Sequence, residues 1–348
     1  MTLKLNRRHF LSTAAAGAVA TSLPLSARAA TAFTMQAAWI NDAEFAGYFL
    51  GIDEGYYADA GLDLTYLSGG PVSFLGIDEV YYADAGLDLT YFSGGPDVIP
   101  ESTIIAGRAD LALTTPDTTI KAIADQGAPF KIIGAQYQKN PIGIVSLVSN
   151  PINEPKDLIG KTLAVPPVNV ISVNAMLALN GIKPDQVNIV PYAYDPTPLI
   201  QGEIDASLDF TTNVPYTISQ QGVEATSFLL YDFGFTIYND TVVVTEETLA
   251  TKRTELIAWL RASRQGWEQN FKDPNLWPQK WADTWFKGTG RTIENEIFFN
   301  NAQQPLMESP AGYMALTEEG IEANLSALGE VGIKGSRNMF DTTLLEEI

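Results

Sequence analysis

The sequence predicts an α/β protein with two lobes, each a mainly parallel sheet flanked by helices, with a two-strand hinge and a helical C-terminal tail. From Phe33 onward, short apolar strands alternate with helical segments, which is typical of β-α-β units. The 348 residues also exceed the usual size of one hydrophobic core, which favours two lobes. Beyond Glu246 the pattern becomes almost entirely helical.

The expected strands are short apolar or alternating runs bounded by turn residues. In chain order they span residues 34–39, 62–66, 87–91, 111–114, 131–136, 142–148, 162–165, 187–192, 206–209 and 241–245. The expected helices span residues 44–60, 100–106, 118–124, 170–180 and 196–201. In the tail, we expect the rings of Trp277, Trp281 and Trp285 to pack in the core.

Two segments, residues 137–144 and residues 231–242, are candidates for chain crossings between the lobes. A chain that crosses twice forms one discontinuous and one continuous lobe. We therefore expect lobe I to span 30–140 plus 242–348 and lobe II to span 141–241. Two-strand hinges of this kind occur in proteins whose lobes close on a ligand.

A tandem duplication lies in lobe I, where residues 49–71 and 74–96 differ at only two positions. Each copy has the pattern of a helix, an Ala-Gly stop, an alternating strand and a Ser-Gly-Gly-Pro turn. Repeat arrays need about three or more units to bury a continuous core, so we interpret the pair as a local duplication. We expect the first copy to supply the helix and the second to supply the turn at Ser93, Gly94 and Gly95, with the material between looped out or added at an edge.

The first 29 residues have the pattern of an export peptide. Arg7 and Arg8 precede Phe-Leu as in twin-arginine signals, and an uncharged run leads to a small-residue site ending at Ala29. A membrane-spanning N-terminus is the alternative, but the apolar run is too short for about 30 Å of hydrocarbon. We expect an exported, soluble protein in the periplasm.

The composition excludes several kinds of chemistry. The chain has no cysteine, and its only histidine, His9, lies in the expected export peptide. Ser-His and Cys-His nucleophilic systems and almost every zinc site are therefore absent from the remaining chain, and we expect no catalytic residue, no metal and no cofactor. Four of the 21 basic residues and none of the 41 acidic ones lie in that peptide, which leaves 17 against 41, a formal charge of −24. This acidity disfavours nucleic acid and anionic membranes as partners.

Five motifs follow one another along the chain. They are Trp39-Ile-Asn41 at a strand end, the duplicated Tyr-Tyr-Ala-Asp-Ala-Gly-Leu-Asp-Leu unit, Ala106-Gly-Arg-Ala-Asp110-Leu, Asn153-Glu-Pro-Lys-Asp-Leu-Ile-Gly-Lys161 and Gln201-Gly-Glu-Ile-Asp205-Ala. In order and spacing they resemble the periplasmic solute-binding proteins of ABC importers, which have the type II periplasmic binding protein fold, in the group that binds thiamine pyrimidine precursors. The resemblance covers nearly all of residues 33–270.

The resemblance implies a monomeric, non-catalytic receptor that delivers a small molecule to an inner-membrane ABC permease and its ATPase. Two departures from the family pattern matter. The family has one copy of the duplicated unit. A fungal branch of the fold makes the pyrimidine with an active-site histidine and a cysteine-rich motif, both missing after residue 29. The second departure argues against that enzymatic activity.

In open α/β sheets, ligands bind at the carboxyl ends of the strands. This topology gives the candidate ligand-binding residues, which are Trp39, Asn41, Ser93, Gly94, Gly95, Thr114, Thr115, Asn169, Ser172, Tyr192, Tyr194, Asp209 and Asn213. Several have a structural alternative: Trp39 could belong to the core, Thr115 could cap a helix, and the Ser-Gly-Gly-Pro segment could be only a turn.

The candidate loops contain neither Lys nor Arg, and residues 184–251 lack both. Anions usually meet a charge-assisted donor, most often Arg, although backbone amides at a helix start can also bind them. Aromatic rings with amides, hydroxyls and carboxylates suit a flat, neutral or weakly cationic heterocycle. We expect a small heteroaromatic nutrient such as a thiamine pyrimidine precursor, with nitrate, sulfonate or taurine as the alternative.

Two further functional classes stay open at this point. One is an exported enzyme that uses carboxylates such as Asp195 and Asp209 as acid and base, for which the sequence has no spacing signal. The other is a purely structural protein, which would show no stabilisation by any ligand.

Overall fold

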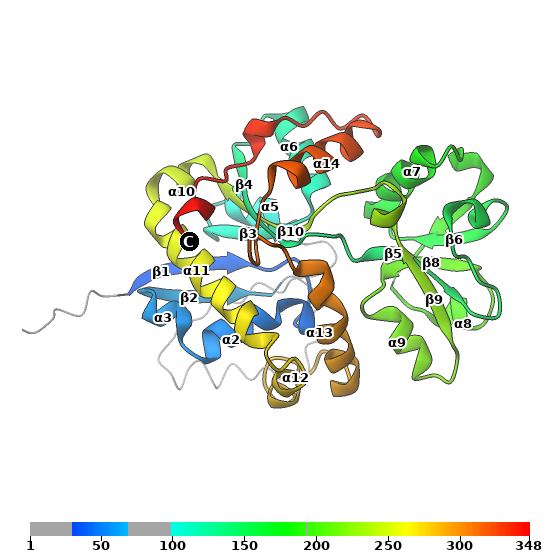
Figure 1. The fold of residues 1–348 in the computed structure, drawn as a ribbon, viewed down its shortest axis with the longest axis horizontal. Helices are drawn as coiled ribbons and strands as arrows, with labels where there is room; N and C mark the ends of the chain where they lie inside the picture. Colours follow the sequence, from blue (N-terminus) through cyan, green and yellow to red (C-terminus); the bar gives the residue numbers. More distant parts are fainter. Residues whose placement is uncertain (1–29, 69–98, 193) are drawn as a thin grey trace, which may run out of the picture. The chain divides into compact units, whose positions relative to one another are not determined.

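The computed structural model describes residues 30–68, 99–192 and 194–348 (Figure 1). The expected export peptide, the expected strand at 87–91 and the turn at Ser93, Gly94 and Gly95 lie outside these residues. The described chain forms two five-stranded sheets with helices packed around them. This arrangement confirms the predicted α/β class.

The first sheet has the strand order β2-β1-β3-β10-β4. Strands β2 and β3 both run parallel to β1, whereas β10 runs antiparallel to β3 and β4. The strand bounds are β1 (Thr31–Gln36), β2 (Leu62–Leu67), β3 (Leu111–Thr114), β4 (Phe130–Tyr137) and β10 (Asn239–Thr245).

The second sheet repeats this arrangement in the order β7-β6-β8-β5-β9. Strands β7 and β8 run parallel to β6, and β5 runs antiparallel to β8 and β9. The strand bounds are β5 (Ile142–Leu147), β6 (Thr162–Val165), β7 (Asn188–Pro191), β8 (Ala206–Phe210) and β9 (Ala225–Leu229).

Both sheets are thus mixed, where the sequence pattern predicted mainly parallel strands. The exceptions are β5 and β10, which run antiparallel to both of their neighbours. Strand β5 begins at Ile142, just after the chain leaves the first sheet, and β10 begins at Asn239, where the chain returns to it. A strand's direction depends on its partner, and local periodicity does not reveal the partner. Strand β9 was not predicted, because its polar Ala-Thr-Ser start hides the apolar pattern.

The sheet membership of the chain changes within both ranges expected for the crossings. Residues Thr31–Ile348 nevertheless form one compact unit. The lobe boundaries at 140/141 and 241/242 therefore stay a prediction.

The expected helix at 44–60 is divided into three pieces. They are η1 (Ala43–Phe45), α2 (Ala46–Asp53) and α3 (Tyr56–Asp59). Asp42 caps the first piece by accepting a hydrogen bond from the Glu44 backbone N–H. The break between α2 and α3 falls at Gly55, whose φ of 76° is left-handed and therefore favours glycine.

The four other helices expected before Glu246 lie close to their predicted positions, short helices that the sequence did not predict occur between them, and helices fill the tail. Those before the tail are α5 (Pro100–Ile105), α6 (Pro116–Gln126), η2 (Pro155–Leu158), η3 (Pro167–Asn169), α7 (Val170–Leu179), η4 (Pro184–Gln186), α8 (Thr197–Ile200), α9 (Val214–Ser219) and η5 (Leu230–Phe233). Those of the tail are α10 (Glu246–Thr251), α11 (Arg253–Asn270), α12 (Leu276–Lys280), α13 (Ile293–Met307), α14 (Glu318–Gly329), η6 (Arg337–Met339) and η7 (Leu345–Glu347).

The tail packs on the first sheet and its helices. Helix α11 crosses α2, and the rings of Trp259 and Trp267 on α11 are completely buried there (Figure 1). Trp277 and Trp281 are buried as expected, whereas Trp285 is only partly buried against Phe49. The tail therefore completes the core of the first sheet.

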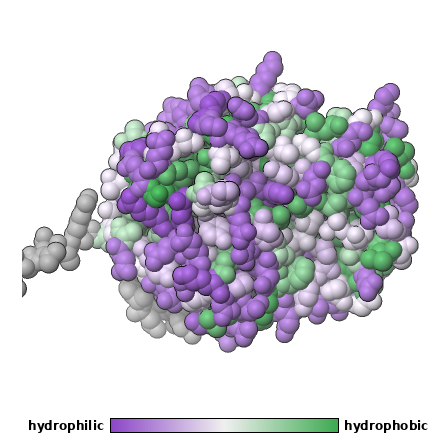
Figure 2. All heavy atoms as spheres, viewed as in Figure 1, coloured by the Kyte–Doolittle hydropathy of each residue, from purple (hydrophilic) through white to green (hydrophobic). Residues whose placement is uncertain are grey.

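The surface is mostly polar on the face shown in Figure 2, with hydrophobic residues in separate patches. Within the described ranges, no helix has both the length and the apolar character needed to cross a bilayer.

Candidate ligand-binding site

The carboxyl ends of the parallel strands carry the predicted site residues. In the first sheet, Trp39 and Asn41 follow β1. In the second sheet, Tyr192 and Tyr194 follow β7, and Asp209 lies near the end of β8. Because parallel strands end at the same edge of a sheet, each sheet presents its candidates together.

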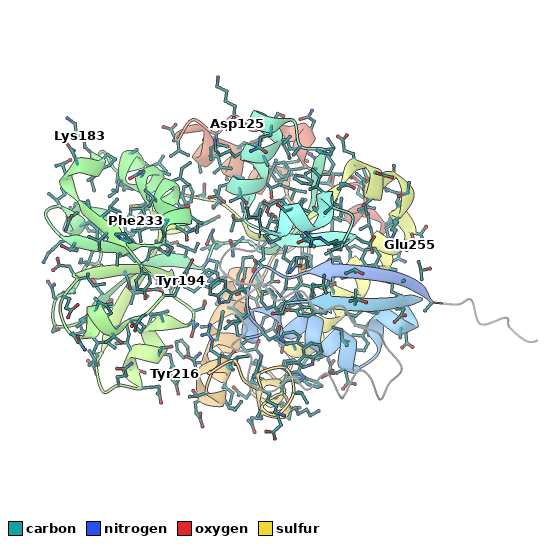
Figure 3. All side chains as sticks on the ribbon, turned by 180° about the vertical axis from the view of Figure 1, so that it is seen from behind. Asp125, Lys183, Tyr194, Tyr216, Phe233 and Glu255 are labelled. Atoms are coloured by element: carbon teal, nitrogen blue, oxygen red, sulfur yellow. The ribbon has the colours of Figure 1, made fainter. Side chains whose placement is uncertain are left out.

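An aromatic contact joins the candidates of the two sheets. The ring centroids of Trp39 and Tyr194 lie 5.2 Å apart with an interplanar angle of 56°, and those of Tyr194 and Tyr192 lie 5.9 Å apart. Tyr194 is labelled in Figure 3. Tyr194 is 44% exposed, and Val168, which follows β6, is 65% exposed. Accessible apolar surface therefore gathers at these strand ends.

A buried carboxyl group lies behind the tyrosines. Asp209 is 5% exposed and accepts a hydrogen bond of 2.5 Å from the Ser207 hydroxyl. Burial raises the pKa of Asp209 to about 7, against the lowering effect of its Ser207 and Tyr192 neighbours. No Lys or Arg side chain pairs with Asp209 among the described residues. A buried carboxyl without a cation is suited to N–H donors of a ligand.

Polar atoms at the same strand ends have no hydrogen bond within the described residues. They include the side-chain oxygen of Asn41 and the hydroxyls of Tyr192 and Thr212. The Tyr192 hydroxyl lies close enough to Asp209 for that carboxyl to raise its pKa, yet it lacks the geometry of a hydrogen bond. Because buried polar groups are nearly always bonded, the lack of a partner within the described residues makes these atoms candidate contacts for a ligand.

The predicted threonines are instead tied to their own sheet. The Thr114 hydroxyl lies 2.7 Å from that of Thr119 and 3.2 Å from that of Thr241. Thr119 donates in turn to Glu101, at 2.9 Å. Thr115 is the N-cap residue of α6, but its side chain makes no capping bond. These contacts favour a structural role for Thr114.

The remaining second-sheet candidates differ in their contacts. The Ser172 hydroxyl on α7 donates to Asp117 on α6 at 3.5 Å, which links helices from the two sheets. Asn169 precedes α7 and is half-buried without a side-chain capping bond. The side-chain oxygen of Asn213 accepts a hydrogen bond of 2.8 Å from Asn295.

The first copy of the duplicated segment reaches this site. It forms α2, α3 and β2, and its Ser68 hydroxyl donates to the Trp39 carbonyl at 3.5 Å. Gln36 also donates to the Ser68 carbonyl, at 3.2 Å. The expected helix of the first copy is therefore present, and this copy also supplies a strand and the first residue of its own turn.

Sequence reasoning missed a buried group of acidic residues beside the β1 end. Asp42, Glu44, Asp240 and Glu296 are all buried, and Arg291 pairs with Asp42 at 2.9 Å. Burial is the largest cause of a raised pKa in all four, to about 7 for Asp42 and about 6 for Asp240. Nothing in the local sequence indicates that Arg291 and Glu296 of the tail lie beside the end of β1, so this group could be found only from the fold.

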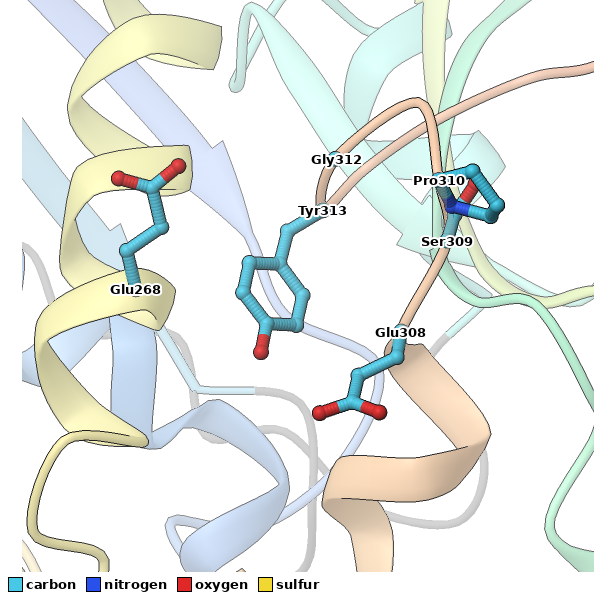
Figure 4. Close-up of a pocket in the computed structure, with 6 residues that line it drawn as sticks. All are labelled: Glu268, Glu308, Ser309, Pro310, Gly312 and Tyr313. Carbon is cyan, nitrogen blue, oxygen red and sulfur yellow. The ribbon is translucent and has the colours of Figure 1, made fainter.

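Neither a metal cluster nor the hollow beside α11 coincides with the candidate site among the described residues. Within residues 30–68, 99–192 and 194–348, no three His, Cys, Asp or Glu side chains converge as metal ligands would. A hollow of about 440 Å³ lies between α11 and the loop after α13, lined by Glu268, Glu308, Ser309, Pro310, Gly312 and Tyr313 (Figure 4). It contains none of the predicted residues. The strand ends remain the better candidate, because buried polar and aromatic groups converge there.

A match to a known protein family shows which family the chain belongs to. A family model described as NMT1/THI5 like matches residues 73–276, which is more than half of the 348 residues. The chain belongs to the NMT1/THI5-like family. The family match begins beside the second copy of the duplicated segment, so it covers Asp209 and both tyrosines but not Trp39.

Two curated proteins are similar to this NMT1/THI5-like chain. The riboflavin-binding protein RibY of Chloroflexus aurantiacus is 22% identical over 246 residues, covering 70% of this chain and 63% of that protein. The formylaminopyrimidine-binding protein of Halalkalibacterium halodurans is 23% identical over 244 residues, covering 68% of this chain and 66% of that protein. The chain thus matches less than two thirds of the length of either relative.

Solved structures share the fold of this family member. The periplasmic aliphatic sulphonate binding protein SsuA from Escherichia coli gives a TM-score of 0.62 at 11% identity, covering 86% of this chain and 91% of its own. The ligand binding component of an ABC-type import system from Staphylococcus aureus gives 0.62 at 10% identity, covering 91% and 98%. The predicted periplasmic binding protein fold is confirmed.

Proposed function

We propose that this NMT1/THI5-like protein is the substrate-binding component of an ABC importer and captures a small heteroaromatic nutrient at the strand-end site. The observation that carries the proposal is the Trp39–Tyr194 ring contact beside the uncompensated Asp209 carboxyl. Aromatic rings bind a flat heterocycle through its faces, and a carboxyl binds its N–H groups through an edge. The two curated relatives, named for riboflavin and formylaminopyrimidine, support this ligand class.

An anionic ligand is the rival, since SsuA is a sulphonate binding protein. Arg291 is the cation that approaches the β1 end, and its guanidinium is already paired with Asp42. Three further buried carboxyl groups surround that pair. An anion at this edge would face several acidic groups and one neutralised cation, which disfavours it.

Ligand capture would proceed by closure of two lobes, 30–140 plus 242–348 and 141–241. The change of sheet between Tyr137 and Ile142, and the return to the first sheet at Asn239, support this division. The contact of Trp39 with Tyr194 joins the two parts at the proposed site. A ligand that touches both sides binds the closed form more tightly and shifts the population toward it.

The same proposal places the protein in the periplasm as a monomer that docks on an inner-membrane permease with its ATPase. The sequence of the first 29 residues and the names of the structural relatives support this location. The role is non-catalytic, so a bound ligand should be recovered unchanged.

Calorimetry on the purified protein tests the ligand class. The panel contains riboflavin, thiamine and a formylaminopyrimidine, together with nitrate, taurine and an alkanesulfonate. We expect binding to at least one heteroaromatic compound and none to the anions. Mass spectrometry of the recovered ligand checks that it is unchanged. Tight binding of the anions alone would exclude the heteroaromatic ligand, and turnover would exclude a pure binding protein.

A further inference from the structure

The first turn of α13 contacts the second sheet through Asn295, which is 5% exposed. Its side-chain N–H donates to the side-chain oxygen of Asn213 at 2.8 Å, and its side-chain oxygen accepts from the Thr217 hydroxyl at 3.1 Å. Asn213 follows β8, and Thr217 lies on α9. One amide therefore holds two points of the segment that leaves the second sheet's site edge.

The next residue, Glu296, holds the first sheet's site loop. Its carboxylate accepts a hydrogen bond of 2.6 Å from the Ala43 backbone N–H and one of 3.1 Å from the side chain of Asn295. Arg291, two residues before α13, pairs with Asp42 in the same loop. This loop also carries Trp39 and Asn41. Because a carboxylate accepts only, Glu296 also fixes which end of the Asn295 amide faces Asn213.

Aromatic contacts extend the link along α13. Phe298 stacks on Tyr216 of α9 with ring centroids 4.8 Å apart, and Phe299 meets Phe210 of β8 edge-on at 6.4 Å. Helix α13 thus contacts both η1 and α9.

We propose that Asn295 and Glu296 are positioning residues that hold the Trp39–Ala43 loop of the first sheet and the Asn213–Thr217 segment of the second in register for ligand binding. This role rests on the proposed function, but the register of the two segments can be measured without a ligand. Neither residue needs to touch the ligand, since each acts through the segment that it holds.

The charged surroundings of Glu296 make this link sensitive to acid. The charged groups that interact with it are Arg291 and, from the β1 loop, Asp42. Asp42 interacts in turn with Glu44 of η1 and Asp240 of β10, while Asn213 and Thr217 after the second sheet are uncharged. Burial raises the pKa of Glu296 above its usual value. Its protonation removes an acceptor from the Ala43 or Asn295 N–H, so acidification should loosen the register.

Spin-label distance measurements test the positioning role. The chain has no cysteine, so Asp125→Cys on α6 and Lys183→Cys after α7, both at exposed positions, allow specific labelling (Figure 3). We expect the label-to-label distance distribution to broaden in Asn295→Ala and in Glu296→Gln. The controls are Asn301→Ala and Glu294→Gln, which make the same changes at exposed positions of α13 and should match the wild type.

Acid and ligand provide the second readout. Lowering the pH from about 8 to about 5 should broaden the wild-type distribution more than that of Glu296→Gln, because Gln does not titrate whereas Asp42 and Asp240 titrate in both proteins. Calorimetry with riboflavin and a formylaminopyrimidine should show about tenfold weaker binding in both variants, as expected for one lost buried hydrogen bond to a charged group. Unchanged distances in both variants would overturn the positioning role, whatever the ligand. If the distances are unchanged and both variants bind the ligand normally, only the positioning role is excluded and the proposed function still holds.

Discussion

Trp39 and Tyr194 lie with ring centroids 5.2 Å apart, although Trp39 follows β1 of the first sheet and Tyr194 follows β7 of the second. Tyr194 has a φ of 60°, which is uncommon for a residue other than glycine. Such backbone strain persists where the surrounding structure enforces it, often at binding sites. The pair therefore joins the two sheets at the position where we propose that a ligand binds.

Replacing Trp39 by Leu should weaken binding of the heteroaromatic ligand by about tenfold or more, because a ring face and its buried area are lost. Trp39→Phe keeps a ring face and should lose less. Calorimetry with the tightest ligand of the panel measures both. Tyr313→Leu is the control, since Tyr313 lines the hollow beside α11 and contacts none of the predicted site residues (Figure 4). Equal affinities in Trp39→Leu and wild type would place the ligand elsewhere.

The buried Asp209 carboxyl should lower the free energy of unfolding at neutral pH, although it favours ligand binding. Its pKa is raised from 3.8 to about 7 in the folded protein, so between these pH values the folded state binds more protons than the unfolded one. The free energy of unfolding therefore falls as the pH rises through this window. Each pKa unit corresponds to about 1.4 kcal/mol for one proton. Asp209→Asn stays neutral and should lose this part of the pH dependence.

Urea unfolding at pH values from about 4 to about 8 checks the Asp209 prediction. The difference in unfolding free energy between Asp209→Asn and wild type should shift in favour of the variant as the pH rises, while ligand affinity drops. Asp195→Asn is a matched control, because Asp195 is exposed and has a lowered pKa. A pH-independent difference for Asp209→Asn would show that Asp209 is already ionised in the folded state.

Much of the fold follows from local signals in the sequence. Strands β3 and β6 occupy the predicted residues, because short apolar runs end there at turn residues. The predicted helix at 44–60 was too long, since a single glycine in a helical pattern usually does not reveal its backbone conformation. Gly55 adopts a left-handed φ and divides the helix. The antiparallel directions of β5 and β10 depend on distant partners and had no local signal.

The candidate site was predictable to the same extent. Tyr192, Tyr194 and Asp209 lie together because the parallel strands β7, β6 and β8 end at one edge of their sheet, and this rule needs only the order of the elements. The contact of Trp39 with Tyr194 joins the two sheets, and the rule does not predict it. The contribution of α13 was not predictable. Asn295 and Glu296 look like ordinary polar helix residues, and only the fold shows that both are buried. Burial of polar residues on one face of a tail helix is the structural observation that identifies such positioning residues.

Helices α2 and α11 cross with Gly47 and Gly266 at their contact, and we expect that neither glycine can be replaced by a residue with a side chain without loss of stability. A Cβ on Gly266 would lie 2.1 Å from the Gly47 carbonyl oxygen, and a Cβ on Gly47 would lie 2.3 Å from the Trp267 ring. Gly266→Ala must push the helices apart and should lower the free energy of unfolding by about 1–3 kcal/mol. Gly329→Ala at the end of α14 meets no atom within 4 Å and should be neutral or slightly stabilising. Circular dichroism during urea unfolding compares the two, and equal stabilities would contradict the close contact.

One of the two differences between the duplicated segments falls at a position with a left-handed backbone conformation. Gly55 of the first copy corresponds to Val80 of the second, and Leu67 corresponds to Phe92. The position of Gly55 has a φ of 76°, and a β-branched residue is a genuine outlier there. Open space surrounds Gly55, so the backbone conformation and not crowding sets the cost. The first copy should therefore fit the place of α2 and α3 better than the second, even though the family match begins at the second.

Three deletions, each of 25 residues, leave one copy of the segment with different combinations of the two differing residues. Removing 72–96 keeps Gly55 and Leu67, removing 56–80 keeps Gly55 and Phe92, and removing 49–73 keeps Val80 and Phe92. We expect all three to fold and bind, because one copy supplies every element that the family requires. The last should be less stable than the second by about 1–2 kcal/mol, the cost of a left-handed conformation for a residue with a Cβ. Urea unfolding measures the differences. Equal stabilities would show that the Gly55 position does not select the copy, and loss of folding and binding in all three would show that both copies are needed.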